Sequence, residues 1–78
     1  MALSRLPSCS GREAAKIFVT YGWSIRRDRE HIVLTKIDSL FHLSIPNHRE
    51  VDRALLHDQI KRAGLTDQLF RQRFDELF

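Results

Sequence analysis

The chain has 78 residues, which is below the usual size of a domain, so one small core is expected and a second domain does not fit. Hydrophobic residues make up 42% of the chain and charged residues 29%, a balance that favours a packed core and excludes a disordered chain. No apolar run is longer than three residues, which argues against a membrane span or a secretory signal, and the expected location is the cytoplasm.

The charge and cysteine content point in the same direction. The net charge of +3 comes from 13 Lys and Arg against 10 Asp and Glu, which weakly favours a polyanionic partner. Cys9 is the single cysteine, so an internal disulfide is excluded and the reducing cytoplasm suits the chain.

The first predicted element is a helix. Ser10 and Glu13 have the spacing of a capping box, which places the helix start near Gly11, and Gly22 supplies a left-handed stop. Residues 1–9 are predicted to form a short tail, and residues 10–78 a single domain. The apolar residues of the helix recur at helical spacing: Ala14, Ile17, Phe18 and Tyr21.

After this helix the pattern changes to the alternation of apolar and polar residues that is typical of half-buried strands. It covers residues 23–26, 31–35 and 40–45, with a turn at residues 36–39 and Pro46 ending the last strand. We therefore expect a three-stranded antiparallel meander.

Alternation also predicts which side chains face the helices. If the two faces determine the register, His31 lies opposite Ser44 on one side and Arg26 on the other. The open face would carry Ser24, Arg26, His31, Val33, His42 and Ser44. The inner face would carry Trp23, Ile25, Ile32, Leu34, Phe41, Leu43 and Ile45.

Two more helices are predicted, at residues 52–63 and 66–77, the first closed by Gly64 and the second capped by Thr66. The element order is α-β-β-β-α-α. The predicted fold class is α+β, with the helices packed on one face of the sheet.

Four segments of the chain stand in a recognisable order. A helix ends in an aromatic-bearing glycine turn at residues 21–23, and His31 precedes an apolar run. The third strand ends in Ile-Pro-Asn-His at residues 45–48, and a helix closes with Ala-Gly-Leu at residues 63–65. This order, over residues 10–74, resembles the HicA family of toxin ribonucleases, whose fold is similar to that of double-stranded RNA-binding domains.

The resemblance implies a function and partners. It implies an mRNA endoribonuclease that is the toxin of a type II toxin-antitoxin system in stress response, with His31 as the catalytic residue. A HicB-like antitoxin would cover the open sheet, and DNA would be contacted only indirectly, through the antitoxin complex.

The chain departs from the family pattern at three places. Arg-Glu at residues 29–30 replaces Gly-Ser before the histidine, Ile-Asp-Ser at residues 37–39 replaces a Pro-Asp-Gly-like turn, and Ala-Leu at residues 54–55 replaces Gly-Thr. Two of these changes remove the access of glycine to positive φ. The alternative function is therefore a domain of the same fold that binds RNA or protein without cleaving.

The chemistry of RNA cleavage suits a histidine. The 2′-hydroxyl must lose a proton to attack the adjacent phosphate, and an imidazole titrates close enough to neutral pH to move it. Arg26, Arg27 and Arg29, with Lys36, concentrate charge near His31, and of these Arg26, Arg29 and Lys36 are candidate RNA contacts, as is His42. The competing interpretation is an exposed strand histidine among solvated turn charges.

Other site types find less support. The histidines and Cys9 lack the paired ligand spacings of zinc sites, so no metal and no cofactor is expected. A DNA-binding repressor is a further alternative, but the helix at residues 52–63 shows no evident base-reading face.

Overall fold

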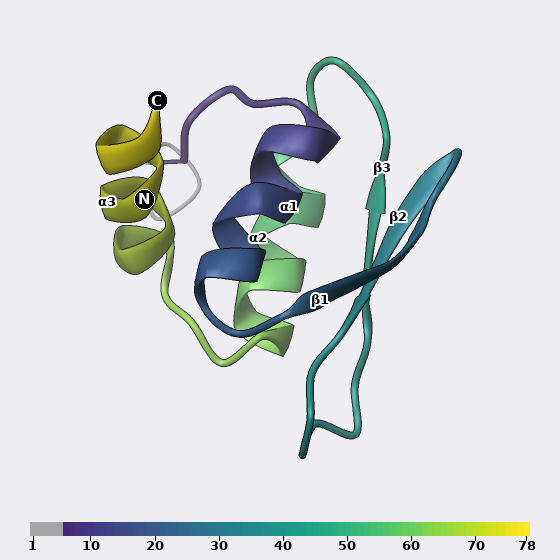
Figure 1. The fold of residues 1–78 in the computed structure, drawn as a ribbon. Coiled ribbons are helices and arrows are strands. Elements are labelled where there is room, and N and C mark those ends of the chain that lie inside the picture. The colour runs from purple at the N-terminus through teal and green to yellow at the C-terminus, as the bar shows by residue number, and fades with distance from the viewer. Residues whose placement is uncertain (1–5) are drawn as a thin grey trace.

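The chain folds into three helices and three strands in the order α-β-β-β-α-α, which confirms the predicted α+β class (Figure 1). The computed structural model describes residues 6–78, and residues 1–5 of the predicted tail lie outside that range. The strands form one antiparallel sheet in the order β1-β2-β3, with α1 and α2 on the same side of it (Figure 1). The elements are α1 (Gly11–Thr20), β1 (Ser24–Asp28), β2 (His31–Thr35), β3 (Leu43–Pro46), α2 (Arg53–Arg62) and α3 (Asp67–Leu77).

Helix α1 begins and ends as its sequence predicts. The Ser10 hydroxyl accepts a hydrogen bond from the Glu13 backbone N–H at 3.1 Å, and the Glu13 carboxylate accepts one from the Ser10 N–H at 2.8 Å. At the other end Gly22 has a φ of +97°, and the Trp23 N–H donates to the Phe18 carbonyl at 3.2 Å. This is a Schellman motif, and its left-handed residue is the reason for glycine at position 22.

Helix α2 ends in the same way, and the turn leads directly into α3. Gly64 has a φ of +78°, and the Leu65 N–H donates to the Ile60 carbonyl at 3.0 Å. The Thr66 hydroxyl then caps α3 by accepting from the Leu69 N–H at 3.1 Å. The turn between the two helices therefore pairs backbone groups at the end of α2 and at the start of α3.

A buried polar pair joins α2 to α3. The Nδ1 atom of His57 lies 2.8 and 2.9 Å from the two carboxylate oxygens of Asp67. Asp67 is only 8% exposed, and a carboxylate with so little contact with water requires such a partner. The sequence carries no pattern that marks His57, since the pair forms only when the helices meet.

The core lies between the sheet and the helices, with α3 packed against α1. The rings of Phe18 and Phe70 meet with their centroids 5.5 Å apart. Replacing either ring by alanine should cost about 3–5 kcal/mol of stability, as is typical for buried phenylalanine. The buried hydrophobic residues are Leu6, Cys9, Ala14, Ala15, Ile17, Phe18, Trp23, Ile32, Leu34, Leu43, Ile45, Val51, Leu56, Ile60 and Phe70.

Part of the predicted tail belongs to this core. Leu6 is 1% exposed and Cys9 is 3% exposed. The Cys9 carbonyl accepts from the Val51 N–H at 2.8 Å, and the Leu6 carbonyl accepts from the Arg53 guanidinium at 3.0 Å. Residues 6–9 thus run beside the start of α2. None of the helices within residues 6–78 is long and apolar enough to cross a membrane.

The register of the sheet differs from the predicted one. His31 pairs with Pro46, not with Ser44, and Ser44 pairs with Val33. The third strand begins at Leu43, because residues 40–42 continue the loop from the turn at residues 36–39. The alternation of residues 40–45 suggested a longer strand, and counting from that start displaced the pairing by two residues.

Two members of the predicted inner face are also exposed. Phe41 is 58% exposed because it lies in the loop before β3, and Ile25 is 44% exposed at the edge strand β1. The other five inner-face residues are buried as predicted: Trp23, Ile32, Leu34, Leu43 and Ile45.

The outward side of the edge strand β3 offers no free backbone donor. Alternate residues of a strand share a side, so Ser44 and Pro46 point their backbone away from β2. The Ser44 N–H donates to the side-chain oxygen of Gln59 in α2 at 3.0 Å, and Pro46 has no N–H to offer. Strand addition at this edge is thereby discouraged.

Candidate active site

His31 lies exposed at the start of β2, beside a shallow recess on the open side of the sheet. The recess has a volume of about 380 Å³, and its lining residues are Arg27, Arg29, Glu30, His31 and Val33. The predicted histidine therefore shares a concave surface with two guanidinium groups. Arg29 was a predicted site residue, whereas Arg27 was not.

Arg26 does not lie opposite His31 as predicted, because β1 continues to Asp28 and leaves only residues 29–30 for the turn that was expected to take four residues. A β-bulge then decides which arginine faces the recess: Ile25 pairs with Leu34 and Arg27 pairs with Val33, so the strand holds one extra residue between these pairs. Arg26 is that extra residue, and Arg27 therefore lies opposite Val33 in its place. Because Arg27 shares the open face with Val33, it is brought to the recess.

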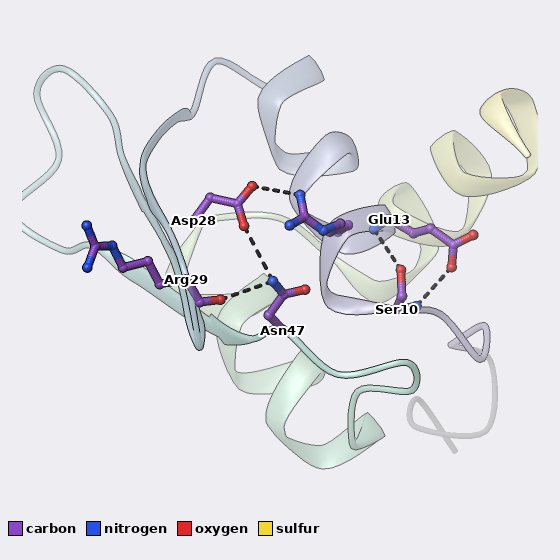
Figure 2. Close-up of polar contacts among 6 residues, drawn as sticks. Ser10, Glu13, Asp28, Arg29 and Asn47 are labelled. Carbon is purple, nitrogen blue, oxygen red and sulfur yellow. Dashed lines mark hydrogen bonds and ion pairs between the residues drawn. The ribbon is translucent and has the colours of Figure 1, made fainter.

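The turn between β1 and β2 is held from below by one amide side chain (Figure 2). The Asn47 side-chain nitrogen donates to the Arg29 carbonyl at 3.0 Å and to the Asp28 carboxylate at 3.4 Å. The other oxygen of that carboxylate pairs with Arg12 at 2.7 Å. The Arg29 side chain points away from these contacts (Figure 2). The backbone of the turn is therefore anchored, while the Arg29 guanidinium stays free to bind a ligand.

We call these contacts of Asn47, Asp28 and Arg12 the brace of the turn. Backbone hydrogen bonds extend the brace to the start of α1. The Asn47 N–H donates to the Glu30 carbonyl at 3.0 Å, and the Gly11 N–H donates to the His48 carbonyl at 3.0 Å. A methyl group on Gly11 would collide with the backbone carbonyl of Pro46. Glycine is therefore required here by the close approach of two backbones, and the capping pair of Ser10 and Glu13 fixes the helix at this point (Figure 2).

The recess is electropositive. Arg26, Arg27 and Arg29 are exposed, and within residues 6–78 none of them has a carboxylate partner. Glu30 is the single acidic residue that lines the recess. Two unpaired guanidinium groups beside an imidazole form a surface suited to a phosphate, since guanidinium groups bind phosphate oxygens through charge-assisted hydrogen bonds.

Lys36 and His42 lie at the other end of the sheet. Lys36 follows the last residue of β2 and lines a different recess. His42 immediately precedes Leu43, the partner of Leu34, so it lies about four strand residues from His31, or roughly 13 Å. Both are exposed, but neither is brought together with His31.

The sequence reasoning missed Asn47, and it placed Arg27 in the basic cluster near His31 without selecting it as a site residue. Sequence analysis could have selected Asn47, because it lies in the Ile-Pro-Asn-His segment at the end of the third strand. It could not have selected Arg27, because a one-residue bulge leaves no distinct mark on a run of charged residues.

Neither a search for metal-ligand clusters nor comparison with known proteins identifies the site further. Within the described residues no three side chains of His, Cys, Asp or Glu gather as a metal site would require. No family model, curated protein or solved structure matches the chain.

Proposed function

We propose that this chain is a HicA-like endoribonuclease of the cytoplasm, the toxin of a type II toxin-antitoxin pair, with His31 as its catalytic residue. The observation that carries the proposal is the exposed imidazole on the open sheet, in one recess with the unpaired guanidinium groups of Arg27 and Arg29. The order of motifs over residues 10–74, which resembles that family, adds support.

The proposed reaction needs no group beyond the RNA, water and these side chains. The imidazole of His31 takes the proton of a 2′-hydroxyl, and the freed oxygen attacks the adjacent phosphorus. As this bond forms, the bond from phosphorus to the 5′-oxygen breaks, and that oxygen takes a proton from water, whose hydroxide then accepts the proton held by His31 and restores the neutral imidazole. The products are a 2′,3′-cyclic phosphate and a 5′-hydroxyl. Arg27 and Arg29 stabilise the negative charge that builds on the phosphate oxygens.

The loss of glycine before His31 does not count against this reaction. Within residues 6–78, Asp38 is the only non-glycine residue with a positive φ. The turn at Arg29 and Glu30 therefore closes with ordinary backbone angles, and it is held by Asn47 rather than by glycine flexibility.

One observation favours the alternative of an inactive binding domain. Glu30 lines the same recess, and its carboxylate repels a phosphate that approaches His31. In this alternative the open sheet still binds RNA or a protein, but without cleavage. A HicB-like antitoxin covering the open face would fit either function, since no helix within residues 6–78 covers that face (Figure 1).

The test is cleavage of a single-stranded RNA by purified protein, with the ends of the products identified. We expect cyclic-phosphate ends from the wild type and a loss of about 100-fold or more in rate for His31→Ala, the usual contribution of acid-base catalysis. His42→Ala is the matched control, because this histidine is exposed but lies at the far end of the sheet, and its rate should stay within about twofold.

Three results decide the matter. Cleavage by His31→Ala at the wild-type rate would remove the catalytic assignment. RNA binding by the wild type without cleavage would favour the inactive domain. Growth arrest on induced expression of the wild type, absent for His31→Ala, would support the toxin.

A further inference from the structure

A second recess lies at the opposite end of the sheet from His31, between the β2–β3 loop and the end of α2. Its volume is about 550 Å³. One wall is the loop at residues 36–41, the other is the segment 62–64, and Trp23 lines it as well. In Figure 1 this loop projects from the body of the domain, away from the β1–β2 turn.

The loop presents apolar side chains to solvent. Ile37 is 88% exposed, Leu40 is 99% exposed and Phe41 is 58% exposed. Three large apolar residues this exposed lie within five positions and line one recess, and exposed apolar residues that gather in this way mark binding surfaces more often than isolated ones do.

The loop is nevertheless ordered by its own hydrogen bonds. The Ser39 N–H donates to the Lys36 carbonyl at 3.1 Å, which closes a turn with Asp38 at a φ of +71°. The Ser39 hydroxyl also accepts from the Phe41 N–H at 3.2 Å. The backbone of the loop is thus held in one conformation before any partner arrives, which lowers the entropic cost of binding.

The charge of the lining residues indicates what the recess would accept. Arg62 lies over the Phe41 ring at 6.0 Å from its centroid, and Lys36 flanks the other wall, against a single carboxylate at Asp38. The indole N–H of Trp23 is buried without a hydrogen-bond partner within residues 6–78. Trp23 lines the recess, so its indole can report on a ligand bound there, while two cations against one carboxylate favour an acidic ligand.

We propose that this recess binds an acidic, apolar segment of a partner protein. An apolar side chain of the segment packs on Phe41 and Leu40, and a carboxylate lies between Lys36 and Arg62. The aliphatic side chains of Ile37 and Leu40 favour a protein over a nucleic acid, which would stack on aromatic rings.

The experiment uses a displayed library of random 12-residue peptides, selected on the full-length protein in the absence of RNA. We expect the selected peptides to combine acidic with apolar or aromatic residues. Because the chain has one tryptophan, its NMR spectrum has a single indole N–H resonance, and the selected peptide should shift that resonance. Arg62→Glu and Leu40→Ser should each weaken peptide binding about tenfold or more, the loss expected for one good contact.

Controls separate this site from the proposed active site. Leu77→Ser removes an exposed apolar residue of α3, far from the recess, and should leave peptide binding unchanged (Figure 1). His31→Ala should also bind the peptide as the wild type does, so loss of RNA cleavage and loss of peptide binding are distinguishable. Leu40 is almost fully exposed, so Leu40→Ser tests the recess without loss of core packing.

Several outcomes would overturn the inference. These are peptides without acidic character, or binding that both recess variants leave unchanged. An indole shift caused by oligouridine and lost in Arg62→Glu would show a nucleic-acid site instead. Self-association that Leu40→Ser abolishes would show that a second copy of the chain occupies the recess.

Discussion

The two ends of the β2 strand are built in different ways. At the end that begins with His31, the turn is held by contacts from distant parts of the chain: Asn47 after β3 and, through Asp28, Arg12 in α1. At the other end, the loop at residues 36–41 is held by bonds within itself and leaves its apolar side chains in solvent.

This difference fits two different tasks. The acid-base chemistry proposed for His31 requires a side chain held within a fraction of an ångström, and contacts from distant parts of the chain restrain the turn before it. A docking loop needs only to present its side chains in a defined conformation, which local hydrogen bonds achieve. If the comparison holds, perturbing the brace should impair stability and cleavage, while changes in the loop should affect binding of a partner.

The largest effect on the free energy of unfolding is expected from Gly11→Ala, which disrupts the contact between α1 and the segment that holds the turn. The added methyl group collides with the Pro46 carbonyl, so α1 must move away from the segment that holds the turn. We expect a loss of about 3 kcal/mol in the free energy of unfolding, at the upper end of the range for overpacking. Denaturant titration measures this loss, and RNA cleavage should fall with it.

The matched change at the other end is Asp38→Gly. It relieves a left-handed backbone angle at a non-glycine residue and should raise stability slightly, by about 0.5–1 kcal/mol. RNA cleavage should be unaffected. A larger loss of stability from Asp38→Gly than from Gly11→Ala would break the comparison between the two ends.

A smaller effect, on the rate of RNA cleavage, should distinguish Arg27 from its neighbour Arg26 in the bulge. Arg27→Ala should lower the rate of RNA cleavage about tenfold, because a hydrogen bond from a charged group to phosphate contributes about 1.5–3 kcal/mol. Arg26→Ala removes the same charge from the residue beside it but outside the recess, and should change the rate by less than about threefold. Equal rates for the two variants would show that only net charge matters and that the bulge is irrelevant.

A further effect, which appears only at alkaline pH, concerns the Cys9 thiol near the start of α1. Burial raises the pKa of Cys9 to about 11 from a reference value of 9.0, with Glu13 and Glu50 adding to the effect and Arg53 opposing it. The unfolded chain therefore releases this proton at lower pH than the folded chain, so stability is lost as pH rises from about 9 towards 11.

The measurement is the free energy of unfolding at pH 9 and pH 10 for the wild type and Cys9→Ala. The wild type should lose about 1 kcal/mol more than the variant over this interval, as linkage requires for such a shift. Identical losses would mean that the thiol is exposed to water in the folded state.

Much of the fold could be predicted because local patterns decided it. The capping box of Ser10 and Glu13 and the two left-handed glycines are recognised from neighbours within a few residues, and the structure shows all of them. The inner face of β2 followed from alternation as well. The failures came where local patterns and real boundaries disagree: Leu40 and Phe41 alternate like a strand but belong to a loop, and β1 continues to Asp28 although the alternation stops at Arg26.

The candidate site was less predictable. His31 could be selected from its position and from the motifs around it, and Arg29 from its nearness in the chain. Arg27 depended on the bulge, and Asn47 depended on a contact between β3 and a turn eighteen residues earlier. The pairing of His57 with Asp67 likewise formed only when α2 met α3.

The amino-acid sequence by itself determined the number and order of the elements, where each helix begins and ends, and which strand carries the exposed histidine. These are consequences of spacing, capping and backbone preference within a few residues. The tertiary structure alone decided the register, the bulge that turns Arg27 to the recess, and the brace through Asn47. Such features depend on which distant backbone groups find partners, and no short stretch of sequence contains that information.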